Sequence, residues 1–232
     1  KDRIIVPLDV NNLAKAATLA EELAPYVGCF KIGLELITSV GGPQAVRRIQ
    51  NVRGRVFYDG KFCDIPNTVG AASKAVSDLG VVMFNVHASA GHASIRAAVQ
   101  NKGGSAVLGV TVLTSLDETE CISIFGNTPD NKVLQFAHFL LEEGADGVIC
   151  SPKEACFLIN HPELDELSLV TPGIRPAWAA AQDQKRVMTP YEAIDNGVEC
   201  LVIGRPITNP PPEIGTPIDA VKKIIEEIQS VG

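Results

Sequence analysis

Eight short segments of the chain are continuously apolar except for single polar residues, and they limit the folds open to it. Their cores read IIVPL, CFKI, VFY, VMFNV, AVLGVTVL, GVIC, LSLV and CLVI. A strand covered on both faces has such a nearly continuous run, whereas a strand with one face in water alternates apolar and polar residues. The pattern therefore predicts buried parallel strands over Arg3–Asp9, Gly28–Ile32, Arg55–Asp59, Val82–His87, Ala106–Leu113, Gly147–Ser151, Ser168–Thr171 and Cys200–Ile203.

Amphipathic segments separate these strands. Asn11–Pro25 begins with asparagines that can cap a helix, and Asn131–Glu143 precedes Gly144, a residue type that commonly ends helices. Pro217–Val231 is the last segment with helical spacing. Eight strand–helix units in 232 residues average about 29 residues each, which matches a (β/α)8 barrel. We therefore predict an α/β protein with the (β/α)8 TIM-barrel fold and a single catalytic domain over residues 1–232.

An open, doubly wound sheet is the competing fold. When such a sheet binds a dinucleotide, a G-x-G-x-x-G turn usually follows its first strand. Here the first strand ends in LDVN and no glycine triad follows. The chain also lacks a G-x-x-x-x-G-K-[ST] loop, and we interpret Pro210-Pro211-Pro212 as a stiff surface loop and not as a domain boundary. The barrel is the better interpretation.

Charge, hydropathy and cysteine spacing exclude several classes of protein. The 20 basic and 27 acidic residues give a formal net charge of −7, which argues against a nucleic-acid-binding surface. No apolar run approaches the roughly 20 residues that span a bilayer, and the apolar stretch in KDRIIVPLDV is too short for a signal peptide. The six cysteines are scattered without a C-x-x-C pair. We therefore expect reduced thiols in a cytoplasmic protein with no membrane contact.

Charged residues gather where the predicted strands end, which is the active face of such barrels. Asp59 and Lys61 are two residues apart, so on an extended chain both side chains point to one face. Lys31, on the neighbouring strand, can reach the same mouth, and Asp64 follows closely. Buried charges are tolerated when they are paired, so these residues are consistent with an alternating ring of charges. The alternative is a network of salt bridges that only seals the barrel end.

The end of the eighth strand carries a second signal. Gly204-Arg205, together with the loop after the seventh strand, falls where many barrels bind phosphate. Backbone N–H groups at a glycine turn allow an anion to approach, and a guanidinium adds bidentate hydrogen bonds. The alternative is an ordinary turn with a solvent-facing arginine. Arg175 opens the segment RPAWAAAQDQKRV, which holds the only tryptophan and which we interpret as a mobile lid.

Other reactive residue types give weaker signals. The spacing of the histidines at positions 87, 92, 138 and 161 does not suit a metal site, so we predict none. Cys63 lies within the charged cluster, but no histidine lies near it in sequence to activate its thiol, so we do not expect it to be a nucleophile. The chain has no G-x-S-x-G motif.

The segment that reads DGKFCDIPNT, from Asp59 to Thr68, resembles the orotidine 5′-phosphate decarboxylase family. The resemblance extends over essentially the whole chain through PLDV, FKIG, VTVLTS, TPGIRP, DQKRVMTP and VIGRPIT, in this order and mostly at predicted strand ends. Two positions depart from the family pattern: Gly60 stands where a larger apolar residue is usual, and Cys63 where histidine is common. Neither is one of the charged positions, so the departures concern local packing.

The resemblance implies that orotidine monophosphate loses CO₂ to give uridine monophosphate, the last step of de novo pyrimidine synthesis, without metal or organic cofactor. It makes Lys61 the proton donor to C6, sets Asp59 against the departing carboxylate, and completes the catalytic network with Lys31 and Asp64. It also implies a homodimer in which Asp64 and Thr68 reach the neighbouring subunit's site. The substrate-binding residues that it implies are Asp9, Lys31, Asp59, Lys61, Asp64, Ile65, Thr68, Thr114, Arg175, Gln184, Gly204 and Arg205.

The chemistry of these residue types agrees with the implied roles. Loss of CO₂ leaves an electron pair on C6, which a fixed ammonium group stabilises and protonates. Two alternatives stay open. A sugar-phosphate decarboxylase or aldolase-like barrel shares the D-x-K-x-x-D pattern but uses Mg²⁺, and a non-catalytic barrel would only bind nucleotides. A requirement for divalent metal would favour the first, and absence of turnover would favour the second.

Overall fold

The computed structural model describes residues 1–179 and 188–230. In this part of the chain, eight strands follow one another around a closed barrel in the order β1-β2-β3-β4-β5-β6-β7-β8. The predicted (β/α)8 fold is confirmed, and every predicted strand overlaps an observed one. The strands are β1 (Ile4–Pro7), β2 (Cys29–Ile32), β3 (Val56–Phe62), β4 (Met83–His87), β5 (Ala106–Val110), β6 (Gly147–Ile149), β7 (Ser168–Pro172) and β8 (Cys200–Val202).

Helices occupy the connections between the strands, and the three predicted helices correspond to α1, α7 and α11. Helix α1 begins after Asn12, whose side chain accepts a hydrogen bond from the backbone N–H of Lys15 at 3.0 Å. Gly144, with a left-handed φ of +73°, follows the end of α7 as predicted. The helices are α1 (Leu13–Leu23), α2 (Leu34–Val40), α3 (Gly42–Asn51), α4 (Pro66–Ser77), α5 (His92–Gln100), α6 (Glu118–Phe125), α7 (Pro129–Glu142), α8 (Pro152–Leu158), α9 (Pro190–Asp195), α10 (Arg205–Thr208) and α11 (Pro217–Gln229), with short 3₁₀ turns η1 (Ala88–Ala90) and η2 (Pro162–Leu164).

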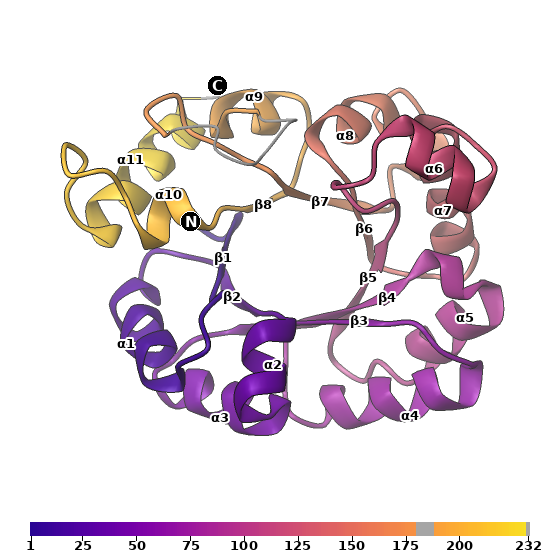
Figure 1. The fold of residues 1–232 in the computed structure, drawn as a ribbon, viewed down its shortest axis with the longest axis horizontal. Coiled ribbons are helices and arrows are strands. Elements are labelled where there is room, and N and C mark those ends of the chain that lie inside the picture. Colours follow the sequence, from indigo (N-terminus) through magenta and orange to yellow (C-terminus); the bar gives the residue numbers. More distant parts are fainter. Residues whose placement is uncertain (180–187, 231–232) are drawn as a thin grey trace. The chain divides into compact units, whose positions relative to one another are not determined.

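The chain divides into two compact units. The terminal unit comprises Lys1–Gly60 and Pro172–Gly232, and the central unit comprises Lys61–Thr171. In the terminal unit, β1 pairs in parallel with both β2 and β8, and Ile5 stands opposite a residue of each. Helices α1 and α3 lie on the outer side of β1 and β2 (Figure 1). The strand residues are buried on both faces, which explains their nearly continuous apolar sequence.

Strands β4 to β7 of the central unit pair in parallel in sequence order. Helices α4 and α5 lie outside β4 (Figure 1). A Cβ at Gly109 of β5 would overlap the side chain of Leu140, so the glycine allows α7 to pack closely on the strand. Phe84 and Val107 are fully buried in the same unit.

Two strands end three residues away from the predicted position, and the other strand ends lie within two residues of it. Strand β3 extends to Phe62, beyond the predicted end at Asp59, so Gly60 and Lys61 still belong to the strand. Strand β5 ends at Val110, before the predicted end at Leu113. Val112 is only 3% exposed although it lies outside the strand, so the apolar pattern there reports burial and not strand pairing. No helix in the described ranges is long and apolar enough to cross a membrane.

Candidate active site

Three charged residues of the terminal unit meet where β1, β2 and β3 end. The Nζ of Lys31 lies 2.9 Å from Oδ2 of Asp59 and 3.3 Å from Oδ1 of Asp9. Lys31 stands opposite Pro7 of β1 and Phe57 of β3, so the parallel register brings the carboxylates that follow these residues to the lysine. The side chains of Lys31 and Asp59 are 14% and 8% exposed, whereas that of Asp9 is 60% exposed. The cluster is therefore buried on one side and open to solvent on the other.

Lys31 keeps its positive charge in this surrounding. Burial by itself lowers the pKa of the ammonium group, but the carboxylates of Asp59 and Asp9, through charge and hydrogen bonding, raise it above its ordinary value. A raised pKa holds the lysine charged across the physiological range. The cluster thus combines one fixed ammonium with two carboxylates.

Gly33, two residues after Lys31, leaves the space that this cluster occupies. A Cβ at position 33 would lie 2.9 Å from Nζ of Lys31 and 3.4 Å from Oδ1 of Asp9. Contacts this short between a methyl group and charged atoms force one of them to move. The absence of a side chain at this position is therefore part of the geometry of the cluster.

Lys61 of the central unit has an unusual backbone conformation near the end of β3. Its φ is +49°, in the left-handed region that residues with a side chain rarely adopt. The extended backbone assumed from the spacing of Asp59 and Lys61 is therefore wrong at this residue. Its backbone N–H donates a hydrogen bond of 2.7 Å to Oδ1 of Asn85 on β4, which supplies a partner for this conformation.

Asp64 follows in the loop between β3 and α4. Its Oδ1 accepts a hydrogen bond of 2.7 Å from the backbone N–H of Ile65, and its carbonyl accepts one of 2.8 Å from Oγ of Ser94. Helix α4 begins at Pro66, a residue suited to the first helical position because its missing N–H needs no partner there. Asp64, Ile65 and Thr68 are all exposed, and Ile65 is 66% exposed despite its apolar side chain.

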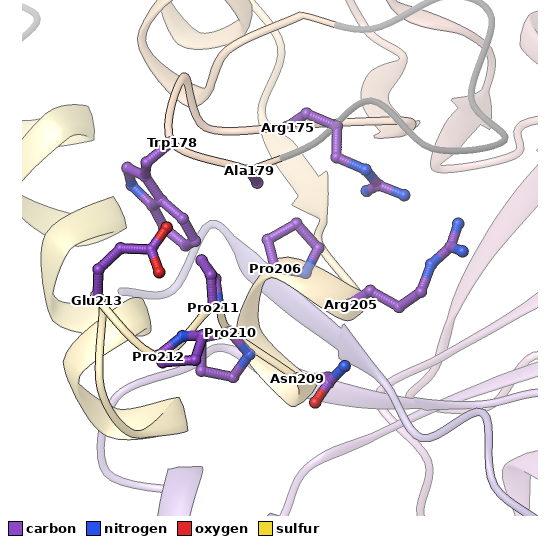
Figure 2. A pocket seen from close by; sticks show the side chains of 10 residues that line it. All are labelled: Arg175, Trp178, Ala179, Arg205, Pro206, Asn209, Pro210, Pro211, Pro212 and Glu213. Atoms are coloured by element: carbon purple, nitrogen blue, oxygen red, sulfur yellow. The ribbon is translucent and has the colours of Figure 1, made fainter.

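Arg175 and Arg205 line a cavity of about 470 Å³ in the terminal unit. Figure 2 shows both guanidinium groups on the same side of this cavity, with Trp178 near Pro211 at the other end. Arg175 is 8% exposed, and its Nη1 donates a hydrogen bond of 2.9 Å to the carbonyl of Ile174. Gly204 immediately precedes Arg205 and α10. The two predicted anion-binding arginines are therefore brought together.

The remaining predicted residues lie elsewhere or outside the described part. Thr114 is exposed in the connection between β5 and α6. Gln184, and with it most of the predicted lid, lies outside the described residues. The charged residues predicted to form one ring fall into two groups: Lys31 and Asp59 belong to the terminal unit, and Lys61 and Asp64 to the central unit.

Asn85 and Ser94 form hydrogen bonds with the backbone of Lys61 and Asp64, and the sequence analysis did not identify either of them. Both side chains are buried, at 0% and 2% exposure. Asn85 could have been identified from the sequence, because it is a lone carboxamide within the apolar run VMFNV. Ser94 could not, since a serine within a helix is common.

The histidines and Cys63, the weaker candidates from the sequence, do not form a metal-binding group in the described part of the chain. No group of three or more His, Cys, Asp or Glu residues suited to a metal ion lies within residues 1–179 and 188–230. His92 contacts Glu143 at 3.1 Å, and His138 lies 3.8 Å from Glu163. Cys63 is exposed and unbridged.

A parallel (β/α)8 barrel with charged residues at its strand ends and a pair of arginines beside a cavity is characteristic of barrel enzymes that act on anionic substrates. The family model described as "Orotidine 5'-phosphate decarboxylase / HUMPS family" matches residues 2–215. The chain therefore belongs to this family of enzymes, and the resemblance noted in the sequence is confirmed.

Individual relatives agree over their full length. The orotidine 5′-phosphate decarboxylase of Moorella thermoacetica is 44% identical, with 100% of this chain and 94% of that protein covered. The enzyme of the same name from Geotalea uraniireducens is 43% identical, with 99% and 96% covered. The crystal structure of orotidine 5′-phosphate decarboxylase from Lactobacillus acidophilus has a TM-score of 0.81 at 32% identity, with 97% of this chain and 98% of that chain covered.

Proposed function

We propose that this protein converts orotidine 5′-monophosphate to uridine 5′-monophosphate and CO₂ without metal or organic cofactor. The observation that carries the proposal is the Lys31–Asp59 pair of 2.9 Å at the strand ends, in a chain whose relatives with this activity match it over its whole length. The bond between C6 and the carboxylate carbon breaks, CO₂ leaves, and the electron pair stays on C6. A proton then forms the new C6–H bond.

Lys61 is the proton donor in this proposal. An ammonium group about 4 Å from the developing charge interacts with it by about 4 kcal/mol at an effective dielectric of about 20. Enzymes typically lower barriers by about 8–23 kcal/mol, so this contact is not sufficient alone. Binding energy from distant parts of the substrate supplies more, provided that it is expressed in the transition state.

Lys31, Asp59 and Asp64 complete the proposed charge network around Lys61. The raised pKa of Lys31, caused by Asp59 and Asp9 against the effect of burial, supports a permanently charged member beside the substrate. Asp59 would face the departing carboxylate. Asp9 and Lys31 would together bind the ribose hydroxyls. The side chain of Asp9 contacts Lys31 and is still 60% exposed, so it is accessible to a ligand.

The phosphate would bind at the cavity of Arg175 and Arg205, together with Gly204 and Gln184. Two guanidinium groups on one side of a cavity offer the forked donors that a phosphate accepts. Thr114, exposed after β5, would contact the pyrimidine side of the ligand.

A homodimer is part of the proposal. Ile65 is 66% exposed between Asp64 and α4, and a large apolar side chain in that position suits a subunit interface. Asp64 and Thr68 of one subunit would then reach the site of the other. We further propose that residues 1–232 form one catalytic domain. We also propose a cytoplasmic location, because all six cysteines are free.

A direct assay tests the reaction and separates it from the alternatives. We expect the purified protein to consume orotidine monophosphate, followed by its ultraviolet absorbance, at the same rate with and without a chelator such as EDTA. Loss of activity with EDTA and recovery with Mg²⁺ would favour the metal-dependent sugar-phosphate class. No turnover, with nucleotide binding retained, would favour the non-catalytic barrel.

Replacement of Arg205 tests the phosphate site. We expect Arg205→Ala to lower kcat/KM by at least about 100-fold, because charged hydrogen bonds to phosphate contribute about 1.5–3 kcal/mol and their loss also weakens transition-state binding. Arg48→Ala, which removes another exposed arginine of the same unit, serves as the control. Equal kcat/KM for the two variants would contradict the phosphate role.

A further inference from the structure

Asn85 is a carboxamide in the middle of a buried strand. It is the third residue of β4, and it is 0% exposed like its neighbours Phe84 and Val86. A buried carboxamide disfavours folding unless its hydrogen bonds are made, and an apolar side chain of similar size avoids this cost. Its presence in the run VMFNV therefore points to a contact that an apolar residue cannot make.

One such contact is with the backbone of Lys61. Oδ1 of Asn85 accepts the backbone N–H of Lys61 at 2.7 Å, and Lys61 is the residue with a φ of +49°. A lysine in the left-handed region is unfavourable by itself, so neighbouring groups must hold it there. Of the non-glycine residues in the described ranges, only Lys61 and Arg53 have a positive φ.

A second buried side chain holds the other end of the same segment. Oγ of Ser94, in α5, donates a hydrogen bond of 2.8 Å to the carbonyl of Asp64. Lys61 and Asp64, the two residues of the proposed charge network that belong to the central unit, are thus held through their backbone by buried polar groups of the next strand and helix. Backbone fixation of this kind sets the direction in which each Cα–Cβ bond points.

We propose that Asn85 is a positioning residue for Lys61. The inference rests on the proposed function, in which the Lys61 ammonium protonates C6. The lysine side chain is a flexible four-carbon stem, so the place of its Nζ depends on where the stem begins. By holding the Lys61 N–H, Asn85 fixes the left-handed backbone and hence that starting direction. Supporting groups of this kind determine whether an active site is preorganised.

The first test replaces the acceptor without emptying the space. Asn85→Leu removes Oδ1 and leaves the Lys61 N–H without this partner. We expect kcat to fall by about 100-fold, the loss that a misplacement of about 1 Å causes, while KM and the affinity for uridine monophosphate change less than about threefold. If this variant does not fold, Asn85→Ala carries the same expectation. An unchanged kcat in the folded variant would overturn the proposal.

Two further variants separate positioning from general stabilisation. Asn85→Asp keeps an oxygen that accepts the N–H, and we expect its kcat to exceed that of Asn85→Leu by at least about tenfold. Ser105→Ala is the matched control, because it removes a buried side-chain hydrogen bond of 2.8 Å, to the carbonyl of Val81 before β4. It should lower the melting temperature and leave kcat unchanged. An equal fall in kcat for Asn85→Leu and Asn85→Asp, or for Asn85→Leu and Ser105→Ala, would overturn the proposal.

Lys61→Ala, measured in parallel, distinguishes the two levels of inference. If Lys61→Ala retains turnover, the proposed proton donor is wrong and Asn85 has nothing to position. If Lys61→Ala is inactive and Asn85→Leu has the wild-type kcat, the proposed function stands and the role of Asn85 is wrong.

Discussion

Lys61→Ala is expected to lower kcat by at least about 10⁴-fold, because it removes both the proposed proton donor and the charge that would stabilise the carbanion. Binding of uridine monophosphate should change by less than about tenfold, since in the proposed binding mode the phosphate and ribose contacts do not involve Lys61. The rate is measured by ultraviolet absorbance at high enzyme concentration, and product binding by calorimetry. A large loss of kcat with retained binding is the signature of a group that acts mainly in the transition state.

Lys74→Ala is the matched control for this variant. Lys74 lies in α4 of the same unit, and its Nζ is 2.9 Å from Asp78 in an exposed ion pair one helical turn apart. Such surface pairs contribute little to stability, so kcat and melting temperature should stay close to those of the wild type. Turnover by Lys61→Ala within tenfold of this control would rule out Lys61 as the donor.

Mixing two inactive variants is expected to restore activity if Asp64 acts across the dimer. In a hybrid of Lys61→Ala and Asp64→Ala subunits, one site takes its lysine from one chain and its aspartate from the other, and both are intact. Random exchange of equal amounts gives about half hybrids with one intact site each, so about a quarter of the wild-type activity should return. The measurement is the rate of the mixture, with subunit exchange verified by mass spectrometry of the assembled dimer.

The control mixture combines Lys61→Ala with Asp59→Ala. These two positions lie on the same strand of one chain, so no hybrid site regains both residues. This mixture should stay inactive under every arrangement of subunits. If the mixture with Asp64→Ala stays equally inactive after complete exchange, each site is built within a single chain.

The fold was predictable because the strands of a parallel barrel are buried on both faces, which requires an apolar sequence in each of them. Strand β1, for example, has the apolar sequence IIVP, and all four of its residues are buried. The pairing of Lys31 with Asp59 was predictable for a related reason, since residues at the carboxyl ends of adjacent parallel strands are neighbours. Sequence alone is informative where periodicity and topology determine the position of a side chain.

The conformation of Lys61 was not predictable in this way. Its left-handed backbone is accompanied by a hydrogen bond to Asn85, which is 24 residues away in sequence. Residue propensity favours an extended backbone within a strand, and a tertiary contact overrides it here. The contact of Ser94 with Asp64 was not predictable for the same reason. The two residues are 30 positions apart, and the sequence around each of them does not indicate the contact.

Gly33 shows how an amino acid without a functional group can determine the geometry of a charged cluster. Its φ of −96° is accessible to any amino acid, so the fold itself tolerates a substitution at this position. The restriction comes from Nζ of Lys31, which a Cβ would approach to 2.9 Å. We therefore expect Gly33→Ala to keep the fold but to displace the Lys31 ammonium group from Asp59 and Asp9, a kind of change that abundance-based screens for damaging mutations overlook.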